Sequence, residues 1–364
     1  MKAAILYDVN QPLEIKELRQ DPPKAGEVRV RVGAAGLCAS DHHVMTGAAI
    51  LPLPVVLGHE GAGTVAEVGP GVTRVRPGDR CALSFVSNCG HCRPCRTGNP
   101  QLCDTNMETG ARQYDGTVRL HDGEEDVLQM GKLGVFAESI VIPQQACHPI
   151  PDEVPMQVAA LIGCCVTTGV GSVINMPAAR PGMTVAVFGC GGVGLSVIQG
   201  ARLMNASRII AVDIYDHKLE FSYKFGATDV VNSRGVDPVE AIKEMTGGGV
   251  DMAFDSFGSA ATLNAAVMAI RKAGTAVMIG LGTVGDTAPI DMVDFLRNQK
   301  SLVSSYYGAA SPHETFGKLV AFYLKGKLDV DSLITRRYPL DEINEGFDAL
   351  ARGEDGRGII LFES

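Results

Sequence analysis

Four cysteines in the first third of the chain have the types and spacing to hold a metal ion. They are Cys89, Cys92, Cys95 and Cys103, in the stretch NCGHCRPCRTGNPQLC. Two C-x-x-C steps followed by a gap of seven residues can bring four thiolates to the corners of one tetrahedron. Four such ligands make a closed zinc site, which holds a loop in place and leaves no position open for chemistry. A disulfide framework or unrelated free thiols are the alternatives, but cysteines this dense in a long chain without an export signal favour metal binding.

A glycine-rich turn further along has the pattern of a dinucleotide site. Gly189, Gly191 and Gly194 stand in VAVFGCGGVG, which follows a predicted strand and opens a predicted helix. Glycines there let a pyrophosphate approach the backbone and the helix N-terminus. Asp213 closes the next strand, where its carboxylate can accept hydrogen bonds from ribose hydroxyls and repel a 2′-phosphate. The pattern predicts NAD rather than NADP, and the alternative is a glycine turn without a ligand.

Three further motifs carry side chains that could bind metal or move protons. GLCASDHH contains Cys38, GHEGAG contains His59, and LIGCCVTTG contains Cys164. Taken singly, each has an ordinary explanation as a small core cysteine or a hydrogen-bonded core histidine. Taken together with the two motifs above, the chain resembles the zinc-dependent alcohol dehydrogenases of the medium-chain dehydrogenase/reductase superfamily. The resemblance runs from the first strand to the last and includes both metal sites and the cofactor motif.

The resemblance implies a catalytic zinc ion held by Cys38, His59 and Cys164, in addition to the zinc ion in the Cys₄ site. Two thiolates and an imidazole leave the fourth position to water or substrate. Asp41 is expected to accept the other N–H of His59 and so to fix its tautomer. Glu60 is expected next to the metal, where it either approaches zinc during ligand exchange or serves as a purely structural carboxylate.

The implied reaction is the reversible oxidation of an alcohol to an aldehyde or ketone, with hydride transfer to NAD. Zinc binds the alcohol oxygen as a Lewis acid and favours the alkoxide. The proton leaves through Ser40 and the nicotinamide ribose to His43, whose ordinary pKa of about 6.5 suits proton transfer near neutral pH.

The resemblance also assigns the cofactor and substrate contacts. The cofactor residues are the glycine turn with Gly192 and Val193, together with Thr168, Lys218, Gly280, Leu281 and Arg357, the last on the pyrophosphate. The substrate pocket is assigned to Ala49, Phe85 and Tyr306, with Leu281. One departure from the family is Ala39, at a position that often carries a basic residue on the pyrophosphate.

Composition fits an enzyme and excludes some partners. The chain has 364 residues, 46% hydrophobic and 20% charged, with a formal net charge of -9. This charge gives no basic footprint for nucleic acid. We expect no stretch apolar and long enough to span a membrane, and the N-terminus lacks the features of a signal peptide. The cytoplasm is therefore the expected compartment, and the four cysteines outside the metal sets (Cys81, Cys147, Cys165 and Cys190) are expected to be small buried hydrophobic residues.

The elements that must position these residues form an α/β protein of two domains. The first third reads as short strands, of which EVRVRVGAAG alternates with period two. From about residue 181, strands alternate with helices, including a helix at TLNAAVMAIRKAG. We predict a discontinuous GroES-like catalytic domain at 1–165 and 307–364 and a doubly wound, parallel-sheet Rossmann domain at 166–306. The polar segment 104–134 is predicted to be an extended surface loop.

Two other functions and an oligomeric state complete the expectations. The stretch SFVSNCGHCRPCRTG also resembles a subgroup of nicotinoproteins, which hold NAD permanently and use an external acceptor. A zinc- and nucleotide-binding scaffold without turnover is the non-catalytic alternative. The long segment between Cys103 and Phe136 resembles the loop of dimeric family members, so we expect a homodimer that acts on a small-molecule substrate.

Overall fold

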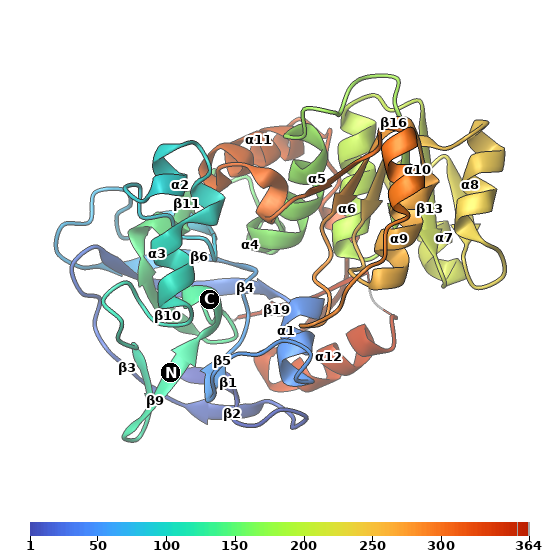
Figure 1. Ribbon diagram of the computed structural model, residues 1–364. Helices are drawn as coiled ribbons and strands as arrows, with labels where there is room; N and C mark the ends of the chain where they lie inside the picture. Colours follow the sequence, from blue (N-terminus) through green and yellow to red (C-terminus); the bar gives the residue numbers. More distant parts are fainter. Residues whose placement is uncertain (355, 363–364) are drawn as a thin grey trace. The chain divides into compact units, whose positions relative to one another are not determined.

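The computed structural model describes residues 1–354 and 356–362 and contains two compact units (Figure 1). Unit 1 comprises Met1–Cys164, Ser311–Gly326 and Val330–Ser364, and unit 2 comprises Cys165–Ala310 and Lys327–Asp329. Unit 1 is therefore discontinuous in sequence. Positions 355, 363 and 364 of the predicted domain segment 307–364 lie outside the described residues.

Unit 1 is built on two β-sheets. The first has the order β11-β7-β6-β4-β19-β18, with β10 also paired to β4. Its strands are β4 (Glu27–Gly36), β6 (Gly61–Val68), β7 (Arg80–Leu83), β10 (Ser139–Pro143), β11 (Cys147–Pro149), β18 (Ile334–Tyr338) and β19 (Arg357–Leu361). The second has the order β2-β1-β5-β9-β8-β3. Its strands are β1 (Lys2–Leu6), β2 (Glu14–Glu17), β3 (Arg19–Gln20), β5 (Val55–Val56), β8 (Leu120–Asp122) and β9 (Glu125–Gln129).

Strand β4 shows why the predicted alternation forms a sheet. Val28, Val30 and Val32 are buried in one hydrophobic cluster, whereas Arg31 between them is exposed. β-Branched residues suit this half-buried, pleated surface. The C-terminal strand β19 pairs antiparallel with β4, so the end of the chain completes the sheet that the start of the chain begins.

Helices of unit 1 are short and connect these strands. The α-helices are α1 (Ala39–Met45), α2 (Arg93–Arg96), α3 (Asp104–Thr109), α4 (Met156–Leu161), α11 (Pro312–Leu324) and α12 (Ile343–Ala351). The 3₁₀ turns are η1 (Pro100–Leu102), η2 (Met130–Lys132), η3 (Gln144–Ala146), η6 (Asp331–Leu333) and η7 (Leu340–Glu342).

Unit 2 is a parallel sheet with the order β14-β13-β12-β15-β16-β17. Its strands are β12 (Thr184–Phe188), β13 (Arg208–Asp213), β14 (Asp229–Asn232), β15 (Val250–Asp255), β16 (Ile270–Met278) and β17 (Ser301–Ser304). Its helices are α5 (Thr167–Ile174), α6 (Gly192–Leu203), α7 (Asp216–Phe225), α8 (Pro238–Thr246), α9 (Ala260–Ala269), α10 (Met292–Arg297) and the turn η5 (Tyr307–Ala309). Numbered from β12, this order is 3-2-1-4-5-6, the order of the Rossmann fold. The predicted fold class is confirmed.

The helix predicted at TLNAAVMAIRKAG is too long at its C-terminal end. Helix α9 ends at Ala269, and the chain continues at once as β16 from Ile270. Ile270 pairs with Val250 and Thr275 with Met252 on the neighbouring strand β15, with a shift in register between them. Pairing with β15 therefore overrides the helical preference of this segment.

One helical stretch runs without interruption from Met156 to Ile174. Helix α4 passes into a π-helical turn, η4 (Ile162–Val166), which passes into α5. The stretch has 19 residues, and a window of 18 of them has a mean hydropathy of 1.7, which is long and apolar enough for a membrane span, so our expectation of no such stretch is wrong by length and composition. However, 83% of that window is buried, as in the core helix of a soluble protein.

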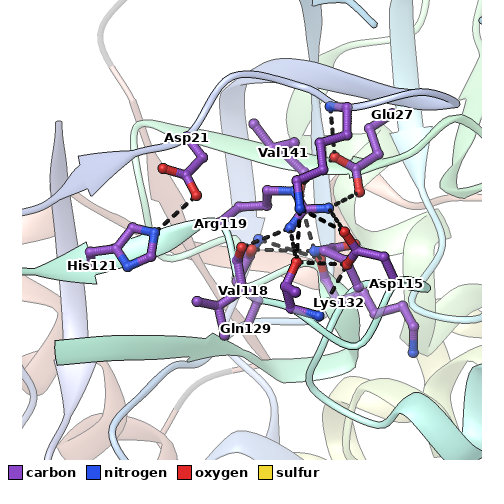
Figure 2. Close-up of polar contacts among 12 residues, drawn as sticks. Asp21, Glu27, Asp115, Val118, Arg119, His121, Gln129, Lys132 and Val141 are labelled. Atoms are coloured by element: carbon purple, nitrogen blue, oxygen red, sulfur yellow. Dashed lines mark hydrogen bonds and ion pairs between the residues drawn. The ribbon is translucent and has the colours of Figure 1, made fainter. Parts of the chain in front are cut away.

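The segment 104–134 is not the extended loop that we predicted, because it contains α3, β8, β9 and η2. Figure 2 shows the buried side chain of Arg119, which forms a bidentate ion pair with Glu27 at 2.8 and 2.5 Å. Asp115 accepts a further hydrogen bond from Arg119 at 3.0 Å. A charged group can be buried when its partners replace water, so a polar segment can pack as part of the domain.

Candidate functional site

Side chains from three distant parts of unit 1 meet in one buried cluster. The ligand atoms of Cys38, His59, Glu60 and Cys164 all lie within 4.8 Å of one another. Each of these residues is at most 8% exposed. The cluster brings together the three predicted ligands of the catalytic metal and the acidic residue predicted to stand beside it.

Local backbone structure explains how the cluster assembles. Cys38 lies two residues after the end of β4 and occupies the N-cap position of α1. His59 precedes β6, which pairs with β4 through Gly61 and Ala35. Cys164 lies in the π-helical turn η4, and π-turns inside α-helices are frequent at functional sites.

Asp41 fixes the orientation of the His59 ring. Its Oδ1 lies 3.1 Å from His59 Nδ1 and accepts a hydrogen bond from the Gly58 amide at 2.9 Å. Asp41 is fully buried on α1. With Nδ1 bonded to this carboxylate, Nε2 is the nitrogen left to bind a metal, as is usual for histidine ligands.

The electrostatics of the cluster favour thiolate ligands. A hydrogen bond from Cys164 and the neighbouring His59 lower the pKa of Cys38 well below its usual value, against the effect of burial. Burial alone would lower the pKa of His59, but the Asp41 carboxylate and Cys38 outweigh it and raise that pKa well above its usual value. Thiolate, not thiol, is the form of cysteine that binds metal.

Glu60 is paired with Arg357, an interaction that the sequence did not indicate. The Arg357 guanidinium donates to Glu60 Oε2, and both side chains are buried. Burial raises the pKa of Glu60, and the positive charge of Arg357 opposes this increase. A Cβ at Gly36 would lie 2.4 Å from Glu60 Oε2, so only glycine leaves room for the carboxylate there. Strand β19 brings Arg357 to this place.

These donors fit a zinc ion with an open position. Two cysteine sulfurs and one imidazole nitrogen are the soft and borderline ligands that zinc prefers, and three protein ligands leave a fourth position for water or substrate.

The four cysteines of the second set also converge. The sulfur atoms of Cys89, Cys92, Cys95 and Cys103 lie within 4.8 Å of one another. The amides of Cys89 and Cys92 donate to the sulfurs of Cys103 and Cys89 at 3.3 and 3.4 Å. Despite burial, hydrogen bonds from Thr105 and from backbone amides lower the pKa of Cys89 to about 6. None of the ten cysteines, all of which belong to the described part of the chain, forms a disulfide bond, so the disulfide alternative has no support. The donor set fits a closed structural zinc site.

The four remaining cysteines are buried as predicted. Cys81, Cys147 and Cys165 are fully buried and Cys190 is 2% exposed.

The predicted proton relay residues lie on α1, next to the first zinc ligand. His43 comes three positions after Ser40, which places the two residues on the same side of this helix. Both are partly buried. The backbone carbonyl of His43 accepts a hydrogen bond from Ala49, a predicted pocket residue, and Ala39 is exposed at the start of the helix.

The glycine turn in unit 2 has a different use for each glycine. Gly189 has φ +91°, which permits the tight turn after β12. A Cβ at Gly191 would meet no atom within 4 Å, which leaves space for a ligand against the backbone. A Cβ at Gly194 would lie 1.8 Å from the carbonyl oxygen of Gly189, so this position needs glycine for the close packing of α6. These features fit the pyrophosphate of a dinucleotide.

Asp213 stands at the end of β13 beside this turn. Its Oδ2 accepts the Cys190 amide at 2.7 Å, and its Oδ1 accepts the amides of Ile214 and Tyr215 at 2.8 and 3.1 Å. Lys218 lies on the following helix, with Nζ 5.0 Å from the centre of the Tyr215 ring. The carboxylate is thus held at the position where the fold binds the adenosine ribose.

The other predicted residues divide between the two units. Phe85 lies in unit 1, where its ring packs edge-on against His59 with centroids 5.4 Å apart. In unit 2, Gly169, the neighbour of Thr168, packs closely on the Val193 carbonyl oxygen, since an added Cβ would lie 2.4 Å from it. Gly192 begins α6, Gly280 and the exposed Leu281 follow β16, and Tyr306 is 42% exposed before η5.

Two parts of the chain match models of known protein families. Residues 24–152 match the alcohol dehydrogenase GroES-like domain, and residues 192–325 match the zinc-binding dehydrogenase family. An alcohol dehydrogenase zinc-binding domain protein from Burkholderia ambifaria is 34% identical, with a TM-score of 0.95. Benzyl alcohol dehydrogenase from Acinetobacter calcoaceticus is also 34% identical, with a TM-score of 0.94. Each alignment covers 100% of this chain and 99% of the other.

Two more distant structures contain a nicotinamide cofactor. One, a zinc-binding dehydrogenase from Sinorhizobium meliloti 1021 bound to NADP, is 26% identical with a TM-score of 0.82, and 99% of each chain is covered. The other, an alcohol dehydrogenase (rspB) from E. coli CFT073 complexed with NADH, is 27% identical with a TM-score of 0.83, covering 100% of this chain and 99% of that one. By sequence, fold and similarity along its whole length, this chain belongs to the zinc-dependent alcohol dehydrogenases of the medium-chain dehydrogenase/reductase superfamily.

Proposed function

We propose that the protein oxidises an alcohol reversibly to an aldehyde or ketone, with NAD as hydride acceptor and two zinc ions per chain. The observation that carries the proposal is the convergence of Cys38, His59 and Cys164, with Asp41 on the outer nitrogen of His59. This arrangement supports an open catalytic metal site, whereas the Cys₄ cluster supports a closed one.

A zinc ion at the open site would act as a Lewis acid on the substrate oxygen and lower its pKa. The chain's own residues would then move the proton and hold the site in shape. Ser40 and His43 stand successively along α1, where a hydroxyl and an imidazole can pass a proton toward solvent. Arg357 holds Glu60 within the ligand cluster and balances its charge.

NAD rather than NADP is the proposed cofactor. Asp213 carries its charge at the position of the adenosine ribose, where it would repel a 2′-phosphate. The carboxylate accepts hydrogen bonds from three backbone amides, and these bonds keep that charge in place. Relatives of this fold are found with NADP and with NADH, so the local charge, not the fold, supports this choice.

A homodimer is the proposed assembly, formed through the β17 edge of the sheet in unit 2. Strand β17 is an edge strand and is largely exposed. Large apolar side chains are exposed in the preceding helix α10, where Met292 and Leu296 are each 80% exposed. An exposed apolar patch beside an unpaired strand edge suits a second copy of the chain. Light scattering that reports a monomer would contradict this proposal, and Leu296→Glu should weaken a dimer.

The central test combines activity and metal content. NAD reduction is measured by absorbance with primary, secondary and aromatic alcohols, and zinc is counted in the same purified protein. Turnover with about two zinc ions per chain supports the proposal, as does its loss in Cys38→Ser. A protein that binds zinc and NAD but turns over no alcohol would instead be a scaffold.

A further inference from the structure

A buried lysine lies near the Cys₄ cluster, and the proposed reaction does not use it. Lys132 is 1% exposed, and its backbone has φ +63°, which is uncommon for any residue except glycine. Burial lowers the pKa of its ammonium group to about 8, and the Cys103 thiolate opposes this effect. Cation burial and an unfavourable backbone conformation both cost free energy, and such costs are concentrated at sites with a specific role.

Lys132 binds the C-terminal end of α3. Its Nζ donates to the backbone carbonyls of Asn106 and Gly110 at 2.9 and 2.8 Å. Carbonyls at a helix C-terminus have no partner within the helix, and a lysine can supply one. Helix α3 follows Cys103 directly, so Lys132 anchors the far end of a helix that starts at a Cys₄ ligand.

The side chain of Asn106 extends this connection toward Phe85. Asn106 is buried, and its Oδ1 accepts a hydrogen bond from the Ser87 hydroxyl at 3.2 Å. Its Nδ2 donates a long hydrogen bond of 3.5 Å to the Phe85 carbonyl oxygen. The anchored helix therefore holds the backbone of Phe85 and the side chain of Ser87.

Gly131, the residue before Lys132, contacts Phe85 directly. A Cβ built on Gly131 would lie only 2.8 Å from the Cβ of Phe85. Gly131 also has φ +57°, so glycine suits this position for two reasons. The Gly131–Lys132 turn thus contacts Phe85 in two ways. Gly131 packs against Phe85 directly, and Lys132 is linked to it through Asn106.

Phe85 in turn packs against the catalytic cluster. Its ring meets the His59 ring edge-on at 89°, with centroids 5.4 Å apart. We infer that the Gly131–Lys132 turn is a positioning device that holds Phe85 against His59 and so couples the Cys₄ loop to the catalytic cluster. The inference rests on the proposed function for the role of His59 as a metal ligand and of Phe85 as a pocket residue.

The test compares Lys132→Met and Asn106→Ala with wild type, using protein that carries cobalt(II) at the Cys38–His59–Cys164 site. Visible absorption bands of cobalt report the geometry of its ligands. Kinetics with an alcohol that the wild-type protein oxidises give KM and kcat separately. Both variants should shift the cobalt bands and raise KM more than they lower kcat. Misplacement of a pocket by ~1 Å can cost roughly 100-fold in efficiency.

A matched control separates positioning from general stability. Lys300 is a second buried lysine, in unit 2, and its Nζ donates to the Val267 carbonyl at 3.0 Å. Lys300→Met should lower the melting temperature and leave the cobalt bands and KM unchanged. Lys132→Gln, which can still donate to a carbonyl, should recover part of the wild-type spectrum and KM.

The inference is overturned if Lys132→Met and Asn106→Ala keep the wild-type cobalt bands and KM. Asn106→Ala keeps the carbonyl that Lys132 binds, so it serves as the test if Lys132→Met does not fold. Failure of the proposed function would look different, because wild-type protein itself would then fail to bind cobalt at the three-ligand site or to oxidise any alcohol of the panel.

Discussion

Glu60 and Arg357 form a buried ion pair although 297 positions separate them in the sequence. One partner precedes β6 in the first part of unit 1, and the other begins β19 near the end of the chain. The catalytic cluster is therefore completed only when the C-terminal strand has joined the sheet. Folding of the tail and formation of the metal site are linked by this pair.

Arg357→Met should destabilise the protein strongly, because it leaves the Glu60 carboxylate buried without its cation. Loss of one partner of a buried pair costs about 3–5 kcal/mol. Urea denaturation measures the change in the free energy of unfolding. The double variant Glu60→Gln/Arg357→Met should be more stable than Arg357→Met alone. Equal stability of the single and double variants would show that the pair is not coupled.

The two metal sites should respond differently to the loss of one cysteine. Cys38→Ser should abolish alcohol oxidation with a small change in melting temperature, whereas Cys95→Ser should lower the melting temperature strongly. The reason is that a closed zinc site contributes folding free energy and an open one supplies chemistry. Zinc content and calorimetry of both variants provide the measurement. A Cys95→Ser protein with wild-type stability and no turnover would reverse these roles.

Cofactor preference should depend on the charge of Asp213. Asp213→Gly should reduce the preference for NAD over NADP, because the repelling carboxylate is gone. The carboxylate also accepts hydrogen bonds from three backbone amides. Asp213→Asn is therefore the matched variant, because it removes the charge and retains a hydrogen-bond acceptor. The ratio of kcat/KM for the two cofactors is measured for each. An unchanged ratio in both variants would contradict the assignment.

Ala39→Arg should tighten NADH binding. The wild-type chain has an exposed alanine at this position, where family members often have a cation for the pyrophosphate. A hydrogen bond to a charged group contributes about 1.5–3 kcal/mol, or roughly ten- to a hundredfold in affinity. Turnover should slow if release of NADH limits the rate. Isothermal titration gives the affinity, and wild-type protein that is purified with stoichiometric NAD would instead favour the nicotinoprotein alternative.

Stability should fall on mild acidification because of two histidines whose rings are in contact in unit 1. The rings of His148 and His313 have centroids 3.9 Å apart, and the Arg74 guanidinium contacts His313. Burial lowers the pKa of His148 well below its usual value, and burial with the Arg74 charge lowers that of His313 to about 4. Between about pH 6.5 and 4 these two histidines bind more protons in the unfolded chain than in the folded one, so their contribution to the free energy of unfolding decreases as the pH falls.

Urea midpoints at pH 7.5 and 5.5 test this prediction while most carboxylates stay ionised. His313→Phe should show a smaller decrease between the two pH values than wild type. A decrease of the same size in both proteins would assign the pH dependence to other groups.

Local patterns in the sequence predicted the elements that have a regular period. The buried valines of β4 alternate with the outward arginines Arg29 and Arg31, and the glycine turn at Gly189 comes between a strand and a helix as its motif requires. In both places the determinants lie within a few residues of one another. The two cysteine sets are a similar case, although only the resemblance to a family joined Cys38 to Cys164.

Long-range partners are what the sequence could not supply. The segment 104–134 is polar and contains several glycines, which favours a loop until Arg119 finds Glu27, 92 positions earlier in the chain. Lys132 looks like a surface residue until its partners on α3 are known. The end of α9 depends in the same way on pairing with β15. Each error comes from an interaction that no local window contains.

The π-helical turn at Ile162–Val166 also limits which changes of length the chain can accept. A π-helical turn holds one residue more than an α-helical turn, so deletion of one residue would let this stretch close as an ordinary α-helix. Cys164, which lies in the turn, would then lose the widened backbone that places it in the ligand cluster. Neighbouring side chains can absorb many point substitutions, but they cannot replace a residue that is missing from the widened turn. A deletion scan should therefore show a sharp boundary of intolerance at this turn, with single-residue deletions tolerated far better in the exposed loop near Gly285.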